Sequence, residues 1–167
     1  MTNPILAIVA RKQGSCQWLG ETALSQLALL AGYRGAVSDW NLDGNAGVAV
    51  LSPGARATAR PSQGGEAATC LAVEGTPVVE CGGGLGKFVA ADTQRLLDDV
   101  MCRDIQALSQ WRGAFAMCLW DPRRRRMLAA RDALGRHPLY YRIEPDAVII
   151  CSSLEWLINK PFRRAPD

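Results

Sequence analysis

The sequence predicts an α+β fold in which antiparallel sheets are stacked and helices lie outside them. Near the C-terminal end, three turn signals stand at Asp121-Pro122, at Ala133-Leu134-Gly135 before His137-Pro138, and at Glu144-Pro145-Asp146. They separate four short segments rich in strand-forming residues: 114–120, 127–131, 139–143 and 147–151. The connections are too short for crossover helices, so we expect antiparallel pairing.

The first of these segments is apolar on both faces. One face would carry Phe115, Met117 and Leu119, and the other Ala114, Ala116, Cys118 and Trp120. A strand that is buried on both faces needs a packed layer on each side of its sheet. This segment therefore predicts layers above and below the sheet that contains it.

The remaining elements follow from periodicity, turn residues and caps. We expect strands at 4–10 and 45–51, a hairpin of 70–73 with 77–80, and helices at 21–31, after Asp92, and at 105–110. Loops are expected at 33–40, 52–66 and 81–86. After the last strand, Ser152 as N-cap and Glu155 at N3 predict a capping box and a final helix.

Composition indicates one ordinary globular domain and excludes several function classes. A chain of 167 residues can bury a sizeable core. The net charge of +3 comes largely from the four arginines 123–126. We interpret them as a solvated hairpin tip, because no second basic patch supports nucleic-acid binding.

The cysteines indicate neither a zinc site nor a disulfide scaffold. Six cysteines show no C-x-x-C spacing, and His137 is the single histidine. Cys118 and Cys151 lie in expected strands and should be small core residues. There is no signal peptide and no apolar run of about 18 residues. These features predict a cytoplasmic protein with reduced thiols, no metal, no cofactor and no membrane contact.

Three segments also carry a family resemblance: R-G-A-F-A-M-C-L-W-D, then L-A-A-R-D-A-L-G-R-H-P-L-Y-Y, then I-I-C-S-S-L-E-W-L. Their order and spacing resemble the end of the glutaminase domain of asparagine synthetase-type proteins, which are class II glutamine amidotransferases. The resemblance implies the N-terminal-nucleophile hydrolase fold, a four-layer αββα sandwich of two antiparallel sheets. It implies a domain over 1–158 and a tail over 159–167 that resembles the linker into a synthetase domain.

In that family, an N-terminal cysteine attacks glutamine and its own amino group serves as base. An asparagine side chain and a glycine amide then stabilise the oxyanion. By resemblance, Asn3 occupies the nucleophile's place, Glu74 replaces the oxyanion asparagine beside Gly75, and Thr76 replaces a substrate-binding acid. An amide cannot attack, and an anion opposes developing negative charge. We therefore expect no catalytic residue.

Arg34 and Asp92 are what remains of the family's substrate clamp. They could pair with each other, which we favour, or still bind a ligand. Removal of Met1 would expose Thr2, a known type of nucleophile, but one residue off the matched position its side chain points to the opposite face. Cys81, beside three glycines, and His137 are weaker candidates for catalysis, because Cys81 has no nearby histidine and the resemblance treats the turn at His137 as structural.

Relatives without the nucleophile include β-lactam synthetases and lasso-peptide cyclases, in which the domain remains as a scaffold. The leading hypothesis is a non-catalytic scaffold or partner of an ATP-dependent amide-forming synthetase acting in trans. The first rival is an active glutaminase or amidohydrolase that uses Thr2. The second is a small-molecule or peptide-binding module that reuses the old glutamine pocket. Trp156, Leu157, Ile158 and Phe162 would form either a docking surface or core.

Overall fold

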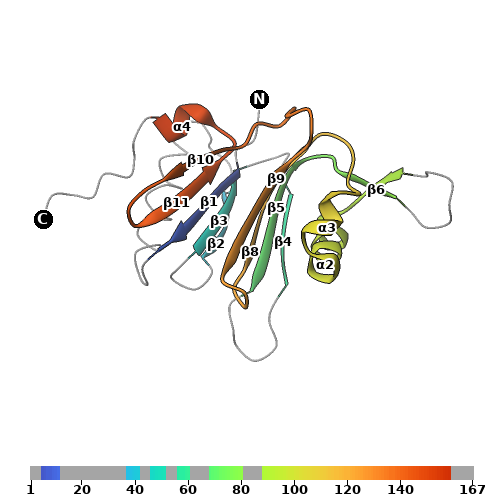
Figure 1. Ribbon diagram of the computed structural model, residues 1–167, viewed down its shortest axis with the longest axis horizontal. Coiled ribbons are helices and arrows are strands. Elements are labelled where there is room, and N and C mark those ends of the chain that lie inside the picture. The colour runs from blue at the N-terminus through green and yellow to red at the C-terminus, as the bar shows by residue number, and fades with distance from the viewer. Residues whose placement is uncertain are drawn as a thin grey trace, which may run out of the picture.

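The computed structural model describes residues 5–11, 37–41, 46–51, 56–60, 68–80 and 88–158, which form two stacked sheets and a two-stranded ribbon (Figure 1). The five-stranded sheet has the order β10 (Tyr140–Ile143), β11 (Ala147–Cys151), β1 (Ile5–Ala10), β3 (Ala46–Leu51), β2 (Val37–Asn41). The four-stranded sheet has the order β4 (Arg56–Arg60), β5 (Thr69–Gly75), β8 (Phe115–Asp121), β9 (Arg126–Arg131). The ribbon pairs β6 (Val78–Glu80) with β7 (Phe88–Ala90). Every strand pair among the described residues is antiparallel, as predicted.

Strand β8 is buried on both faces and lies between two cores. Ala116, Cys118 and Trp120 face the five-stranded sheet, where they share a cluster with Ile5 and Ala7 of β1. The opposite face of β8 carries larger side chains.

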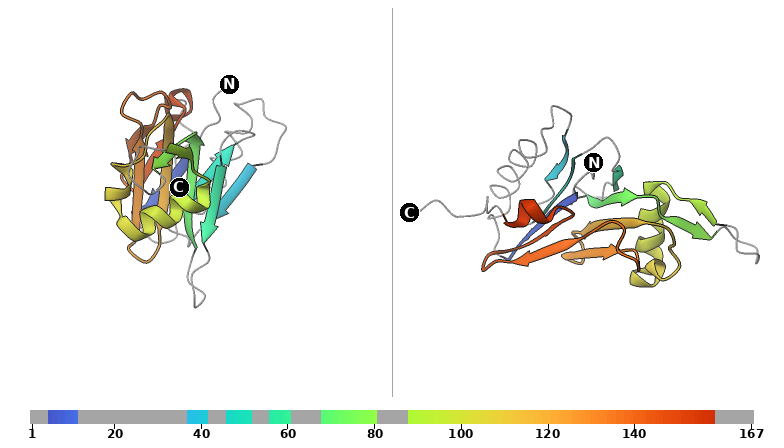
Figure 2. Two further views of the ribbon diagram at one scale, coloured as in Figure 1. Left: turned by 90° about the vertical axis from the view of Figure 1, so that its right-hand side faces the viewer. Right: turned by 90° about the horizontal axis from the view of Figure 1, so that it is seen from above.

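That opposite face packs against helices α2 (Thr93–Arg103) and α3 (Ile105–Leu108). Met117 and Leu119 of β8 share this second core with Leu97 and Val100 of α2. Figures 1 and 2 show both helices on the side of the four-stranded sheet that faces away from the other sheet. The predicted layer on each side of β8 is therefore confirmed.

The outer face of the five-stranded sheet is also buried. Leu6, Ile8 and Ile149 point away from the four-stranded sheet, and each is at most 2% exposed. Helix α4 (Leu154–Ile158) lies on this face, because Arg142, which is paired with Ile149, donates a hydrogen bond to the carbonyl of Leu157. The structure is thus α+β with antiparallel sheets, and a complete four-layer sandwich stays a prediction.

Most predicted elements in the described residues occur near their expected positions. Six strands and helix α3 lie within one or two residues of the predicted ends: β1, β3, β8, β9, β10 and β11, with α3 two residues shorter. Helix α2 begins directly after Asp92, as predicted. Asp92 is the N-cap of α2 as predicted, and its Oδ1 accepts a hydrogen bond from Arg95 N at 2.7 Å. The predicted helix at 21–31 and the loop at 81–86 lie outside the described residues.

Two predicted loops contain strands. The loop at 33–40 includes β2, and the loop at 52–66 includes β4. Both are edge strands, and each pairs along its whole length with one neighbour, β3 or β5. Such pairing is stabilised by backbone hydrogen bonds, which leave little trace in the apolar pattern of the sequence.

The hairpin predicted for 70–73 with 77–80 is wrong. Strand β5 pairs with β4 and β8, and β6 pairs with β7, which the sequence did not indicate. Gly75 has φ of +91°, a left-handed conformation that turns the chain out of the sheet. Thr76 N then donates to Ala114 O at 2.9 Å. The turn is therefore held by the residue just before β8, and not by β6.

The four C-terminal strands do not form one sheet either. Strands β8 and β9 pair in the four-stranded sheet, whereas β10 and β11 pair in the five-stranded sheet. The segment 132–139 crosses between the sheets and carries the turn at Gly135. Strand signals and turn signals alone do not distinguish a hairpin from such a crossing.

The predicted capping box is also wrong. Ser152 Oγ accepts a hydrogen bond from Ile5 N at 2.8 Å, and Ser152 N donates to Ile5 O at 3.0 Å. Ser152 therefore fixes the start of β1, and α4 begins two residues later at Leu154. Ser152 therefore bonds to Ile5, which is distant in sequence, instead of capping the helix that follows it.

Three of the four cysteines at described positions are core residues, whereas Cys102 on α2 is exposed. Cys70, Cys118 and Cys151 are buried and free. Burial raises the pKa of Cys70 and of Cys151 to about 12, and it raises the pKa of Cys118 further. The prediction that Cys118 and Cys151 are small core residues is confirmed.

The arginine-rich hairpin between β8 and β9 is tied to the protein by ion pairs. Arg124 lies 3.0 Å from Asp121, and Arg126 lies 2.9 Å from Asp104, between α2 and α3. The hydrogen bond from Arg126 is the largest influence on Asp104 and holds the pKa of its carboxyl below the usual value.

Among the described residues, no helix is long and apolar enough to cross a membrane.

The burial of β8 predicts a large cost for truncating its side chains. Leu119→Ala should lower the free energy of unfolding by about 2–5 kcal/mol, because Leu119 is 1% exposed between the sheet and the helices. The matched control is Leu134→Ala, where the side chain is 81% exposed and the change should stay within about 0.5 kcal/mol. Denaturant titration measures both. Equal losses in the two variants would contradict the packing described for β8.

Candidate functional site

The candidate site lies where β5 ends, at the edge of the core between the sheets. Cys70, Ala72 and Glu74 alternate along β5, so all three point toward the five-stranded sheet. Glu74 is 4% exposed, which places its carboxylate at the end of an otherwise apolar layer. The charge of Glu74 adds to the effect of burial in raising the pKa of Cys151, which shows that the two groups are near each other.

His137 is the ionisable partner of Glu74. Its Nδ1 lies 3.4 Å from Glu74 Oε1, and its side chain is one quarter exposed. Among the described residues, neither Glu74 Oε2 nor His137 Nδ1 has a hydrogen-bond partner. The family resemblance implied that the turn at His137 is structural. The sequence gave no sign of the contact with Glu74, because the two residues are 63 positions apart.

Gly75 brings the backbone close to His137. A Cβ on Gly75 would lie 2.2 Å from Ala114 O and 2.7 Å from His137 Nε2. Both distances are shorter than any normal contact, so only glycine fits between β8 and the imidazole. Glu74, Gly75 and His137 therefore form one compact group.

The other predicted site residues are placed differently or not described. Asp92 is exposed and caps α2, and Thr76 is exposed beyond the turn. The described structure records no hydrogen bond or ion pair from Asp92 to Glu74 or His137. Thr2, Asn3, Arg34 and Cys81 lie outside the described residues, so the Arg34–Asp92 pair stays a prediction.

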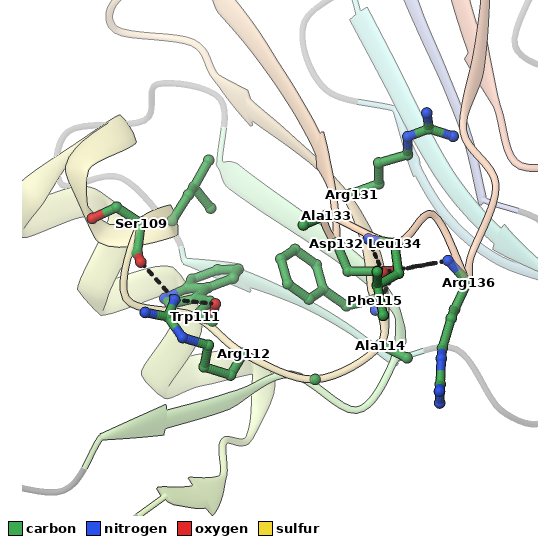
Figure 3. Close-up of a pocket in the computed structure, with 12 residues that line it drawn as sticks. Ser109, Trp111, Arg112, Ala114, Phe115, Arg131, Asp132, Ala133, Leu134 and Arg136 are labelled. Atoms are coloured by element: carbon green, nitrogen blue, oxygen red, sulfur yellow. Dashed lines mark hydrogen bonds between the residues drawn. The ribbon is translucent and has the colours of Figure 1, made fainter. Parts of the chain in front are cut away.

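Asp132 holds the turn that carries His137 (Figure 3). Its buried carboxylate accepts hydrogen bonds from four backbone N–H groups, those of Phe115, Leu134, Arg136 and His137, at 3.0 to 3.5 Å. Burial alone would raise the pKa of Asp132, but these donors outweigh it and hold the pKa below its usual value. The sequence signal for this role was an aspartate before a Leu-Gly turn, which favours such a bonded loop.

The chemistry available to this group is limited. A carboxylate beside an imidazole can exchange protons with a ligand. The buried thiols of Cys70, Cys118 and Cys151 are poor nucleophiles, because their raised pKa values keep them protonated. No cluster of three metal-binding side chains was found within the described ranges. The group suits a cation better than an oxyanion.

Asp132 should stabilise the fold in a pH-dependent way. Asp132→Asn should lower the free energy of unfolding by about 1–3 kcal/mol at pH 7, because the amide places a donor among four donors. The folded-state pKa is depressed, so this stabilisation is complete above the unfolded pKa of about 4 and is lost as pH falls through the folded pKa. The gap between wild type and variant should therefore shrink in acid.

The control for this experiment is Asp92→Asn, which keeps a capping oxygen on an exposed helix end and should change stability little. Urea titrations from pH 3 to pH 7 measure both variants. A gap for Asp132→Asn that stays constant over this range would show that the ionised carboxylate is not what the turn requires.

Comparisons with known proteins match the second half of the chain. Residues 86–159 match the family model described as glutamine amidotransferase domain, a range that includes Asp92, Asp132 and His137 and excludes Glu74.

Two curated proteins are also similar to parts of the chain. Amidase chry2 of Gibberella zeae is 35% identical over 48 residues, which are 29% of this chain and 7% of that protein. Asparagine synthetase [glutamine-hydrolyzing] 3 of Bacillus subtilis is 29% identical over 75 residues, which are 45% of this chain and 12% of that protein. The matched part spans no more than 12% of either relative. Residues 86–159 are thus similar to a glutamine amidotransferase domain.

Proposed function

We propose that this chain is a degenerate glutamine amidotransferase-like domain that does not hydrolyse glutamine and serves as scaffold or partner of an ATP-dependent amide-forming synthetase. The observation that carries the proposal is the buried carboxylate of Glu74, at the position that the family resemblance assigns to the oxyanion donor. Similarity to a glutamine amidotransferase domain and to an asparagine synthetase supports the class of partner.

The charge of Glu74 opposes acyl-transfer chemistry. Hydrolysis of an amide passes through a tetrahedral oxyanion, which donors must stabilise. Loss of one such donor costs about 2.7–4 kcal/mol of transition-state stabilisation. Here the donor is replaced by a buried group that is an acceptor when ionised, and its Oε2 has no hydrogen-bond partner among the described residues.

The exposed apolar side chains of α4 and β10 support a docked partner. Leu154 and Ile158 of α4 are 47% and 61% exposed, and Tyr141 and Ile143 of β10 are 72% and 60% exposed. Strand β10 is also an edge of its sheet. Tyr141 and Ile143 alternate with Arg142, which faces α4, so they lie on the other face of β10. Exposed apolar side chains on a helix or an edge strand are typical of interaction sites.

The side chains of α4 that were expected either to dock a partner or to belong to the core do not all behave alike. Leu157 is 5% exposed and belongs to the core, whereas Ile158 faces outward. Phe162 and the side chain of Trp156 lie outside the described residues. The synthetase would dock on the surface made by Leu154 and Ile158 of α4, from the same polypeptide or a separate one.

One rival function has a specific observation in its favour. A buried carboxylate with an unpartnered oxygen favours a cationic ligand, such as the amino group of a small molecule or peptide. The old glutamine pocket would then be a binding site for amines. The other rival, a glutaminase that uses Thr2, would still have to overcome the charge of Glu74.

The purified protein should release no glutamate from glutamine above the blank. Glu74→Asn should not restore the reaction, nor should Asn3→Cys alone, because the nucleophile, its base and the oxyanion donor act together. A coupled glutamate assay measures all three proteins. Activity in the wild type that disappears in Thr2→Ala would overturn the proposal and favour the glutaminase.

The docking surface can be tested by pull-down and titration with a synthetase encoded beside this chain. Ile158→Ser and Leu154→Ser should each weaken binding at least about tenfold, because exposed apolar anchors dominate such interfaces. Leu134→Ser is the control, since Leu134 is an exposed leucine, at 81%, in the turn after β9 rather than on α4. If all three variants bind as the wild type does, or if no such synthetase binds, the docking surface is wrong.

A further inference from the structure

Strand β9 forms an open edge of the four-stranded sheet. It pairs along its whole length with β8, and none of the described strands lies on its other side. Its residue pairs with β8 are consecutive, so it contains no bulge, and its sequence R-M-L-A-A-R contains no proline. A bulge or a proline would hinder pairing with another chain. The edge of β9 is therefore able to accept a further strand.

Three residues of β9 direct their backbone N–H and C=O groups away from β8. Asp132 N donates to Phe115 O at 2.9 Å, so these two residues form a hydrogen-bonded pair just beyond the end of β9. Such pairs alternate with non-hydrogen-bonded pairs along an antiparallel ladder. The backbone groups of Met127, Ala129 and Arg131 therefore point outward, where they have no backbone partner among the described residues.

The middle of this edge is apolar and carries small side chains. Leu128 and Ala130 pack against the core beneath α2 and α3. Met127 packs against the core between the sheets, and Ala129, on the same face, is exposed. A strand added beside β9 would extend both faces of the sheet, and apolar side chains suit each of them.

Strand β10 adds apolar surface on the same side of the protein. Tyr141 and Ile143 are paired with Ile150 and Val148, which contribute to the core between the sheets. Tyr141 and Ile143 are themselves 72% and 60% exposed. Figure 2 shows β9 and β10 on the same side of the two stacked sheets. The core between the sheets is thus open at this side, and an added strand could help to cover it.

Both ends of β9 are basic. Arg125 precedes the strand and Arg131 ends it, and both are exposed and form no ion pair within the described ranges. The neighbouring acids do not offset them, because Asp121 is paired with Arg124 and Asp132 is buried. A second copy of this chain would bring the same arginines to a shared edge, where like charges repel. An acidic partner is therefore favoured over self-association.

We propose that β9 binds an extended acidic segment of another protein, which joins the four-stranded sheet as a further strand. Backbone hydrogen bonds to Met127, Ala129 and Arg131 would provide the affinity. Apolar side chains in the middle of the segment and an acidic residue at each end would provide the specificity. This edge is a different surface from that of α4, so peptide binding here does not depend on the function proposed above.

Fluorescence anisotropy with a labelled peptide and the full chain tests the binding. The probe alternates valine and threonine between two terminal aspartates and has seven residues, as many as the range 125–131. We expect a dissociation constant below about 1 mM. An analogue with terminal asparagines should bind about fivefold more weakly, because it lacks both charge contacts, and one with terminal lysines more weakly still.

Methylated peptides distinguish strand addition from attraction between charges. In an added strand, every second amide of the peptide donates to β9, and the amides between them point away. N-methylation of one alternate set should abolish binding, whereas N-methylation of the other set should change the affinity less than about threefold. The net charge is the same in both peptides.

Variants of β9 locate the binding on the protein. Ala129→Pro removes an N–H that does not bond to β8, and an edge strand tolerates proline at such a position. This variant should keep the wild-type circular dichroism spectrum and bind the peptide at least about tenfold more weakly. Ala129→Val is the control, because it keeps the N–H.

Charge variants test the two ends of the strand. Arg125→Gln and Arg131→Gln should each weaken binding about threefold, as expected for an exposed charge contact. Arg95→Gln, which removes the same charge on α2, should leave binding unchanged.

Three results would overturn the proposal. The first is that the acidic peptide does not bind below about 10 mM. The second is that the two methylated peptides bind equally well, and this result does not depend on the folding of any variant. The third is that Arg95→Gln weakens binding as much as Arg131→Gln does, which would show a general charge effect rather than a site.

Discussion

The burial of β8 on both faces is the constraint on which the rest of the structure depends. Its small side chains, such as Ala116 and Cys118, lie between the sheets, and its larger ones, such as Met117 and Leu119, lie beneath α2 and α3. Neither face can be exposed to water without losing several apolar side chains from the core. The two sheets and the helices are therefore required together, and the ends of β8 and β5 are held firmly.

The candidate site lies where the end of β5 pairs with the start of β8. Gly75 at the end of β5 is paired with Phe115 at the start of β8, and Glu74 lies one residue earlier at the margin of the inter-sheet core. A carboxylate at this depth costs free energy unless it has partners, and His137 Nδ1 lies 3.4 Å from its Oε1. Burial strengthens the electrostatic effect of the Glu74 carboxylate, and that carboxylate would repel an oxyanion.

The turn that Asp132 fixes carries both Arg136 and His137. Asp132 gathers four backbone N–H groups and so fixes the segment that crosses from one sheet to the other. Of two consecutive residues in that segment, Arg136 lines the cavity between this turn and the segment 108–115, and His137 contacts Glu74. The position of His137 against Glu74 therefore depends on backbone hydrogen bonds within one short turn.

The sequence by itself determined the α+β class, the antiparallel pairing, the two buried faces of β8, the cap at Asp92 and the core positions of Cys118 and Cys151. These depend on local periodicity, local hydrogen bonds and side-chain polarity. Tertiary structure alone decided that β9 and β10 belong to different sheets, that β2 and β4 are edge strands, that Ser152 bonds to Ile5 instead of capping α4, and that His137 meets Glu74. Each of these depends on a partner distant in sequence, and backbone or ion-pair contacts of that kind leave no periodic signal in the chain.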